Sequence, residues 1–167
     1  MVDQNKLELS YEFFPPRTEK GRSNLAATRA ELEPFSPEFF SVTFGAGGST
    51  RDKTVETVVD IQQNSTVDAC PHITCVGASN QEIIDLMETY RSHDISRLLV
   101  LRGDPPSGMV GAGDCRFANE LLELLRNRFG DEFTLYVAAY PEAHPDSRNL
   151  RTEVDYFVRK MQSGAHS

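Results

Sequence analysis

One glutamate in this sequence has a setting that suits acid catalysis. Glu12 ends a short apolar run and is followed by two phenylalanines and two prolines. A carboxyl held among aromatic rings loses hydration of its charged form, and the protonated acid is the form that a proton donor needs near neutral pH. A surface or barrel-bottom salt bridge is the alternative interpretation. Glu12 is therefore a candidate general acid.

Polar side chains also follow four later apolar runs. They are Thr43; His72; Arg102 with Asp104; and Tyr140 with Glu142 and His144. One such residue is more often a helix cap or a hydrogen-bonded core group, but five runs in succession indicate a ligand site. In parallel α/β folds, ligands bind at the carboxyl ends of the strands, where the loops converge.

Two further motifs have weaker chemical meaning. The glycine-rich stretch from Phe44 to Thr50 can bring backbone amides close to an anionic or ring-shaped ligand. It lacks the full dinucleotide fingerprint and the P-loop lysine, so a simple turn fits equally well. Cys70, His72 and Cys75 could suggest a metal, but alternation along a strand points Cys75 away from the other two. We expect no metal site.

The elements that position these residues alternate along the chain. Apolar and β-branched runs at 7–13, 39–44, 69–75, 96–101 and 134–139 predict strands, and each leads into an amphipathic stretch. The repeating unit, about 30 residues long, fits an open doubly wound sheet or a closed barrel of parallel strands. Periodicity alone does not choose between them.

The helices after the second to fifth strands each show an apolar stripe that we expect to face the core. The stripes are Val55, Val58, Val59 and Ile61; Ile83, Ile84 and Met87; Phe117, Leu121, Leu122, Leu124 and Leu125; and Val154, Phe157, Val158 and Met161. Ser79 and Glu82 have the spacing of a capping box, which predicts the start of the helix after the third strand.

Bulk properties narrow the function further. The 167 residues are 39% hydrophobic and 25% charged, as in a globular protein. A formal charge of -8 argues against nucleic acid, which selects clustered Lys and Arg. No apolar run approaches the length of about 20 residues that spans a membrane, and the first residues are polar. We expect a cytoplasmic protein with a small-molecule partner and reduced cysteines.

Five motifs together resemble the methylenetetrahydrofolate reductase family in order and spacing. They are SYEFFPPR at 10–17, SVTFGAGGST at 41–50, PHITC at 71–75, LRGDPP at 101–106 and AAYPEAHP at 138–145. The motifs run through nearly the whole chain. The resemblance implies an α/β fold of the (βα)8 TIM-barrel type, of which residues 1–167 form the N-terminal part of a single FAD-binding catalytic domain.

The resemblance also implies a reaction and roles for residues. FAD is reduced by NADH or NADPH and reoxidised by 5,10-methylenetetrahydrofolate, which becomes 5-methyltetrahydrofolate. Glu12 matches the general acid that protonates the folate, Asp104 a carboxylate beside flavin and folate, and Thr43 a position near the nicotinamide. The positions that match FAD contacts are Phe44, Ala46, His72, Arg102, Gly103, Asp104, Ala118, Tyr140, His144, Glu153, Arg159 and Lys160. Bacterial members usually have Tyr at Phe44, Asp at Glu153 and Asn at Tyr156.

The last residues, 164–167, stand where the family would enter its sixth strand. A complete barrel takes about 250 residues, and five parallel strands that do not close leave two unpaired edges. We expect a homo-oligomeric enzyme when full length, with weak or no turnover by this chain alone. The alternative is a noncatalytic fragment that at most binds flavin or a completing partner. A phosphate-sugar aldolase is disfavoured, because no lysine ends a strand for a Schiff base.

Overall fold

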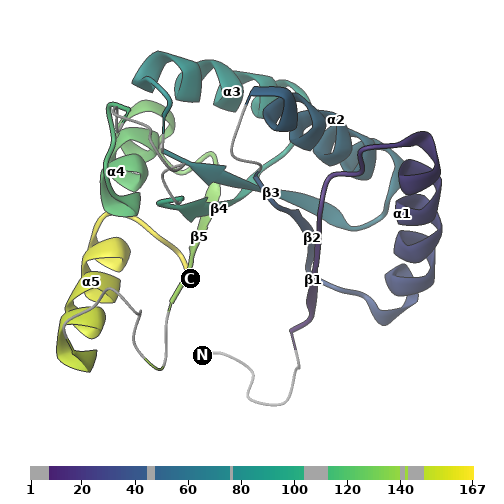
Figure 1. The fold of residues 1–167 in the computed structure, drawn as a ribbon. Helices are drawn as coiled ribbons and strands as arrows, with labels where there is room; N and C mark the ends of the chain where they lie inside the picture. Colours follow the sequence, from purple (N-terminus) through teal and green to yellow (C-terminus); the bar gives the residue numbers. More distant parts are fainter. Residues whose placement is uncertain (1–7, 45–47, 76, 104–112, 140–141, 143–148) are drawn as a thin grey trace.

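Strands and helices alternate through the residues described by the computed structural model, which are 8–44, 48–75, 77–103, 113–139, 142 and 149–167 (Figure 1). The strands are β1 (Ser10–Phe13), β2 (Phe39–Val42), β3 (Asp68–Thr74), β4 (Arg97–Leu101) and β5 (Thr134–Val137). The helices are α1 (Glu19–Leu32), the short 3-10 helix η1 (Glu33–Phe35), α2 (Gly48–Asn64), α3 (Asn80–Ser92), α4 (Ala118–Phe129) and α5 (Leu150–Gln162). The predicted alternation is confirmed, and every strand except β3 is shorter than expected.

The order of the strands decides between the two architectures that periodicity left open. The strands pair in parallel in the order β1-β2-β3-β4-β5. The helices lie along the convex side of the bent sheet, and its concave side is left open (Figure 1). A doubly wound sheet would reverse its strand order and carry helices on both faces. Sequential order with one-sided helices is the arrangement of a TIM barrel, so the described strands form part of a barrel wall.

The convex face of the sheet holds the core. Side chains alternate along each strand, and those on this face pack against the helices. They include Phe40, Val42, Ala69, Ile73, Cys75, Leu98, Val100 and Leu135, which meet Val58, Ile61, Ile83, Met87, Leu121, Leu122 and Leu125. Cys75 belongs to this cluster, whereas Cys70 and His72 are buried outside it. The prediction that Cys75 points away from the other two side chains is confirmed.

Side-chain caps set the helix starts. The predicted capping box is present, since the Glu82 amide donates to Ser79 Oγ at 3.3 Å and the Ser79 amide donates to Glu82 Oε2 at 2.8 Å. At α1, Thr18 Oγ1 accepts from the Gly21 amide at 3.1 Å. At α5, Asn149 Oδ1 accepts from the Thr152 amide at 3.0 Å. Each bond satisfies an amide that has no partner within its own helix.

The predicted core face of α5 is wrong in part. Val154 is 52% exposed and Val158 is 44% exposed, whereas Glu153 is only 6% exposed. Phe117, assigned to the apolar stripe of α4, precedes that helix and is 50% exposed. Periodicity identifies an apolar stripe on a helix but does not show which element covers it. Within the described ranges, no element covers the side of α5 that carries Val154 and Val158.

The residues after α5 return to the sheet beside β5. The His166 amide donates to the Leu135 carbonyl and the Val137 amide to the Ser167 carbonyl, both at 2.8 Å. Arg126 of α4 holds the turn after α5 in place, because its Nε and Nη2 both donate to the Gly164 carbonyl, at 2.8 and 2.7 Å. The segment thus lies where the predicted sixth strand would begin. In the part of the chain that the structure describes, no helix combines the length and apolar character needed to cross a membrane.

Candidate functional site

The predicted strand-end residues that the structure describes come to one end of the sheet. Glu12 and His72 lie within the last three residues of β1 and β3, Thr43 and Arg102 directly follow β2 and β4, and these strands are parallel. Four predicted residues lie outside the described residues: Ala46, Asp104, Tyr140 and His144. The predicted placement of Glu12 and Asp104 around one flavin therefore stays a prediction.

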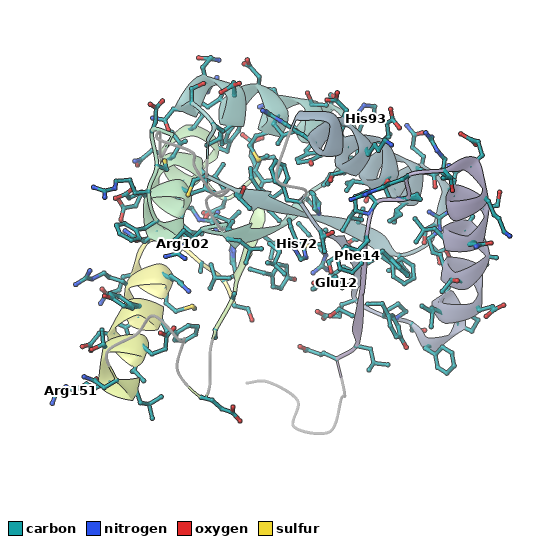
Figure 2. All side chains as sticks on the ribbon, in the orientation of Figure 1. Glu12, Phe14, His72, His93, Arg102 and Arg151 are labelled. Carbon is teal, nitrogen blue, oxygen red and sulfur yellow. The ribbon has the colours of Figure 1, made fainter. Side chains whose placement is uncertain are left out.

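The carboxyl of Glu12 and the imidazole of His72 lie close together at this rim. Figure 2 shows the two side chains next to each other on the concave side of the sheet, and Glu12 Oε2 lies 3.4 Å from His72 Nε2. His72 is buried, and its Nε2 has no hydrogen-bond partner among the described residues. The contact is thus an electrostatic approach without hydrogen-bond geometry. Burial lowers the pKa of His72, and the Glu12 carboxylate opposes that shift, so the imidazole is neutral near pH 7.

The expected enclosure of Glu12 by aromatic rings is wrong for the described structure. The Glu12 side chain is 53% exposed, and Phe14 is 77% exposed. Alternation along β1 sends Tyr11 and Phe13 to the convex face, where their ring centroids lie 6.3 and 5.4 Å from that of Phe40. Glu12 points to the open concave face instead. Aromatic neighbours in the sequence are therefore not its neighbours in space.

Gly103 brings the backbone after β4 close to β3. Its φ is +79°, and a Cβ placed there would lie 2.9 Å from Thr74 Cβ. Only glycine adopts this conformation in so little space without strain. The preceding Arg102 carbonyl lies 3.4 Å from Cys75 Sγ, and burial raises the pKa of that thiol to about 11. The thiol stays protonated, and the glycine leaves backbone without a side chain at the rim.

Thr43, Phe44 and Ala118 contribute through backbone and packing. The Thr43 amide donates to the Phe13 carbonyl at 3.0 Å, and the Thr43 carbonyl accepts from Thr54 Oγ1 at 3.0 Å. These bonds anchor the end of β2 to β1 and α2. Phe44 packs partly against the core, and Ala118 is buried at the first position of α4. The side chains of Phe44 and Ala118 serve the fold, so a ligand would meet mainly their backbone.

The two cations of the predicted basic pair on α5 have different surroundings. Lys160 Nζ donates to the Ala138 carbonyl just beyond β5 at 2.8 Å, which places the amine at the carboxyl end of the sheet. Burial lowers the pKa of Lys160, and Glu153 opposes the shift. Arg159 is exposed and lies over the Tyr156 ring, 6.0 Å from its centroid. Consecutive helical residues diverge by about 100°, which separates the two cations.

A second polar cluster on the concave face was not predicted. Arg97 Nε donates to Asp68 Oδ2 at 3.0 Å, Arg97 Nη1 bonds the Tyr136 hydroxyl, and the guanidinium lies over the Phe39 ring. Phe39 and Tyr136 have ring centroids 4.9 Å apart although two strands separate them, which fits a strongly curved sheet. The sequence clue is an arginine that opens an apolar run. This cluster lies at the amino ends of the strands, where barrel residues serve stability.

No three His, Cys, Asp or Glu side chains within the described ranges gather as metal ligands would. Cys70 lies on the concave face near Arg97, and burial raises the pKa of its thiol to about 12, with Arg97 opposing the shift. A protonated thiol is a poor metal ligand and a poor nucleophile. The described rim thus offers the carboxyl of Glu12, the imidazole of His72, the half-buried amine of Lys160 and the guanidinium of Arg102.

Known proteins resemble this chain along its whole length. The family model described as "Methylenetetrahydrofolate reductase" matches residues 1–167. "Methylenetetrahydrofolate reductase (NADH) 1" of Arabidopsis thaliana is 36% identical over 178 residues, which cover 99% of this chain and 30% of that protein. "5,10-methylenetetrahydrofolate reductase" of Pectobacterium carotovorum subsp. carotovorum is 34% identical over 163 residues, 98% of this chain and 53% of that protein. The chain thus spans only part of these relatives, and it belongs to the methylenetetrahydrofolate reductase family.

Proposed function

We propose that this chain carries the flavin and acid machinery of a 5,10-methylenetetrahydrofolate reductase. The observation that supports this best is the carboxyl of Glu12 beside the buried imidazole of His72, at the ligand-binding end of a barrel wall from this family. The name of the bacterial relative gives the folate substrate, and the name of the plant relative gives NADH. The donor in our proposal is NADH or NADPH, and the product is 5-methyltetrahydrofolate.

The described rim suits FAD in three respects. The imidazole of His72 is buried at the rim beside Glu12, so a flat ring ligand could pack against it. Gly103 leaves backbone bare beside Thr74, so a flat ring could approach closely. Lys160 supplies a cation at the end of β5 that could pair with a phosphate. FAD would accept hydride from the nicotinamide and pass it to the folate, in two successive half-reactions.

The remaining cofactor positions enter the proposal through the family resemblance. Thr43 would lie near the nicotinamide, and Asp104 would orient the folate ring beside the flavin. Phe44, Ala46, Arg102, Ala118, Tyr140, His144, Glu153 and Arg159 complete the proposed FAD contacts. Backbone contacts suit Phe44 and Ala118, because their side chains pack in or against the core.

Glu12 would act as the general acid. Its carboxyl lies on the concave face, where stacked ring ligands would cover the exposed half of the side chain. Loss of water favours the protonated acid. Glu12 would then give its proton to a folate nitrogen as the five-membered ring opens. We further propose that residues 1–167 belong to one barrel domain of a cytoplasmic homo-oligomer.

The flavin part of the proposal is tested with the purified chain. Added FAD should bind and show a perturbed flavin spectrum, which should bleach when NADH or NADPH is added without oxygen. 5,10-Methylenetetrahydrofolate should then restore the colour. A chain that binds no FAD would favour the noncatalytic alternative.

The proton-donor role is tested separately with Glu12→Gln in a protein that carries the complete barrel. This variant should keep flavin reduction by the nicotinamide and lose reoxidation by the folate, because only the second half-reaction takes up a proton from the acid. Glu31→Gln is the control, since it removes an exposed carboxylate on α1, away from the rim. Equal loss of both half-reactions in Glu12→Gln would contradict the assigned role.

A further inference from the structure

We propose that His72 is the positioning residue of the general acid: when a ligand closes the site, His72 Nε2 accepts a hydrogen bond from the protonated Glu12 at Oε2. This rests on the proposed function in one respect only, the role of Glu12 as the acid. The assignment of His72 to a flavin contact does not by itself require any coupling to Glu12.

The geometry of the sheet brings the pair together across an intervening strand. Glu12 pairs with Ser41 of β2, and Ser41 pairs with Cys70 of β3, so His72 lies two residues further toward the carboxyl end. The side chains of Glu12 and His72 therefore meet diagonally over β2. A serine at this point of β2 leaves room for that approach, and the two atoms come within 3.4 Å. A contact of this length can shorten to a hydrogen bond when a ligand closes the site.

The surroundings make Glu12 the charged group to which His72 responds. The groups of the concave face near His72 are Ser41 from β2, Cys70 from β3 itself, and Leu99, which pairs with His72 from β4. Cys70 keeps its proton, as described above. Arg97 lies toward the amino end and is engaged by Asp68 and Tyr136. Among the described residues, the Glu12 carboxylate is the charge that raises the pKa of His72 against burial.

In the closed site, a neutral imidazole protonated at Nδ1 can accept at Nε2 a hydrogen bond from a protonated Glu12. When Glu12 gives its proton to the folate nitrogen, a carboxylate and a neutral imidazole remain. The exposed half of Glu12 then takes one proton back from solvent, and no electrons move in this step.

The test measures the coupling directly by NMR on the chain without flavin. The chain has four histidines, and the imidazole ¹⁵N signals of His72 are identified by their loss in His72→Gln. In Glu12→Gln the titration midpoint of His72 should fall below that of the parent by well more than the fitting error, because the opposing carboxylate is gone. Glu31→Gln should leave the midpoint unchanged. An unchanged midpoint in Glu12→Gln would overturn the proposal.

Circular dichroism establishes that each variant is folded. Because no flavin is present, a chain that fails to bind FAD can still show the coupling, and a chain that binds FAD can lack it.

Discussion

The two faces of this sheet differ in their residue types and in how far helices cover them. Leu98 and Leu99 are neighbours on β4, yet Leu98 is fully buried under the helices and Leu99 lies partly exposed on the concave face. The convex face is almost entirely apolar. The concave face carries Glu12 and His72 at the carboxyl end and the Arg97 cluster at the amino end. The difference indicates that the convex face supplies stability, whereas the concave face carries polar groups that are available for chemistry.

Adjacent leucines give the sharpest test of that contrast. Leu98→Ala should cost about 2–5 kcal/mol of unfolding free energy, because it leaves a cavity in a closed core. Leu99→Ala should cost clearly less, because part of its side chain is already in water. Urea denaturation of both variants measures the difference. Equal losses would show that the concave face is as closed as the convex one.

Gly103 tests how tightly the rim is built. Gly103→Ala should cost about 1–3 kcal/mol, because alanine is strained at φ +79° and its Cβ would press on Thr74. The same denaturation experiment gives the stability. FAD titration should in addition show weaker binding, if flavin approaches this backbone as proposed. A variant as stable as the parent would mean that the backbone at position 103 can rearrange at little energetic cost.

Sequence patterns predicted what depends on neighbours along the chain. The alternation of Cys70 and His72 against Cys75, and the capping box at Ser79, are local and are confirmed. The burial of Glu12 was not predictable in this way, because it depends on which elements cover the concave face. The exposed stripe of α5, at Val154, fails for the same reason.

The strand order and the contacts between side chains on different strands could not be predicted from the periodicity either. The motif resemblance implied a barrel, but the sequential strand order is what excludes the doubly wound sheet. The contact between Glu12 and His72 and the cluster of Arg97 with Tyr136 join residues that are far apart in the chain. Residue types identified Glu12 and His72 as candidates. Their contact became known only from the structure, because it depends on how the sheet brings β1 and β3 together.

Acid sensitivity should distinguish the concave face from the convex one. The pKa of folded His72 lies below its unfolded value of about 6.5, so the unfolded chain binds more protons between those two values. The contribution of His72 to stability should therefore fall as pH falls through that window and stay constant above it. Unfolding measured over this range should show a shallower pH slope in His72→Gln than in the parent. Equal slopes would mean that His72 titrates alike in both states.

The smallest change in stability is expected where the largest change in chemistry is proposed. Glu12→Gln should alter the unfolding free energy by only about 0.5 kcal/mol or less, measured well above the ordinary histidine pKa of about 6.5. The Glu12 side chain is half exposed, and its contact with His72 lacks hydrogen-bond geometry, so little is lost when the charge is removed. A loss comparable to that of Leu98→Ala would show that Glu12 holds the fold together. In that case a defect in folate reduction could not be assigned to proton transfer, whereas a stable variant with that defect would separate the chemistry of the concave face from the packing behind it.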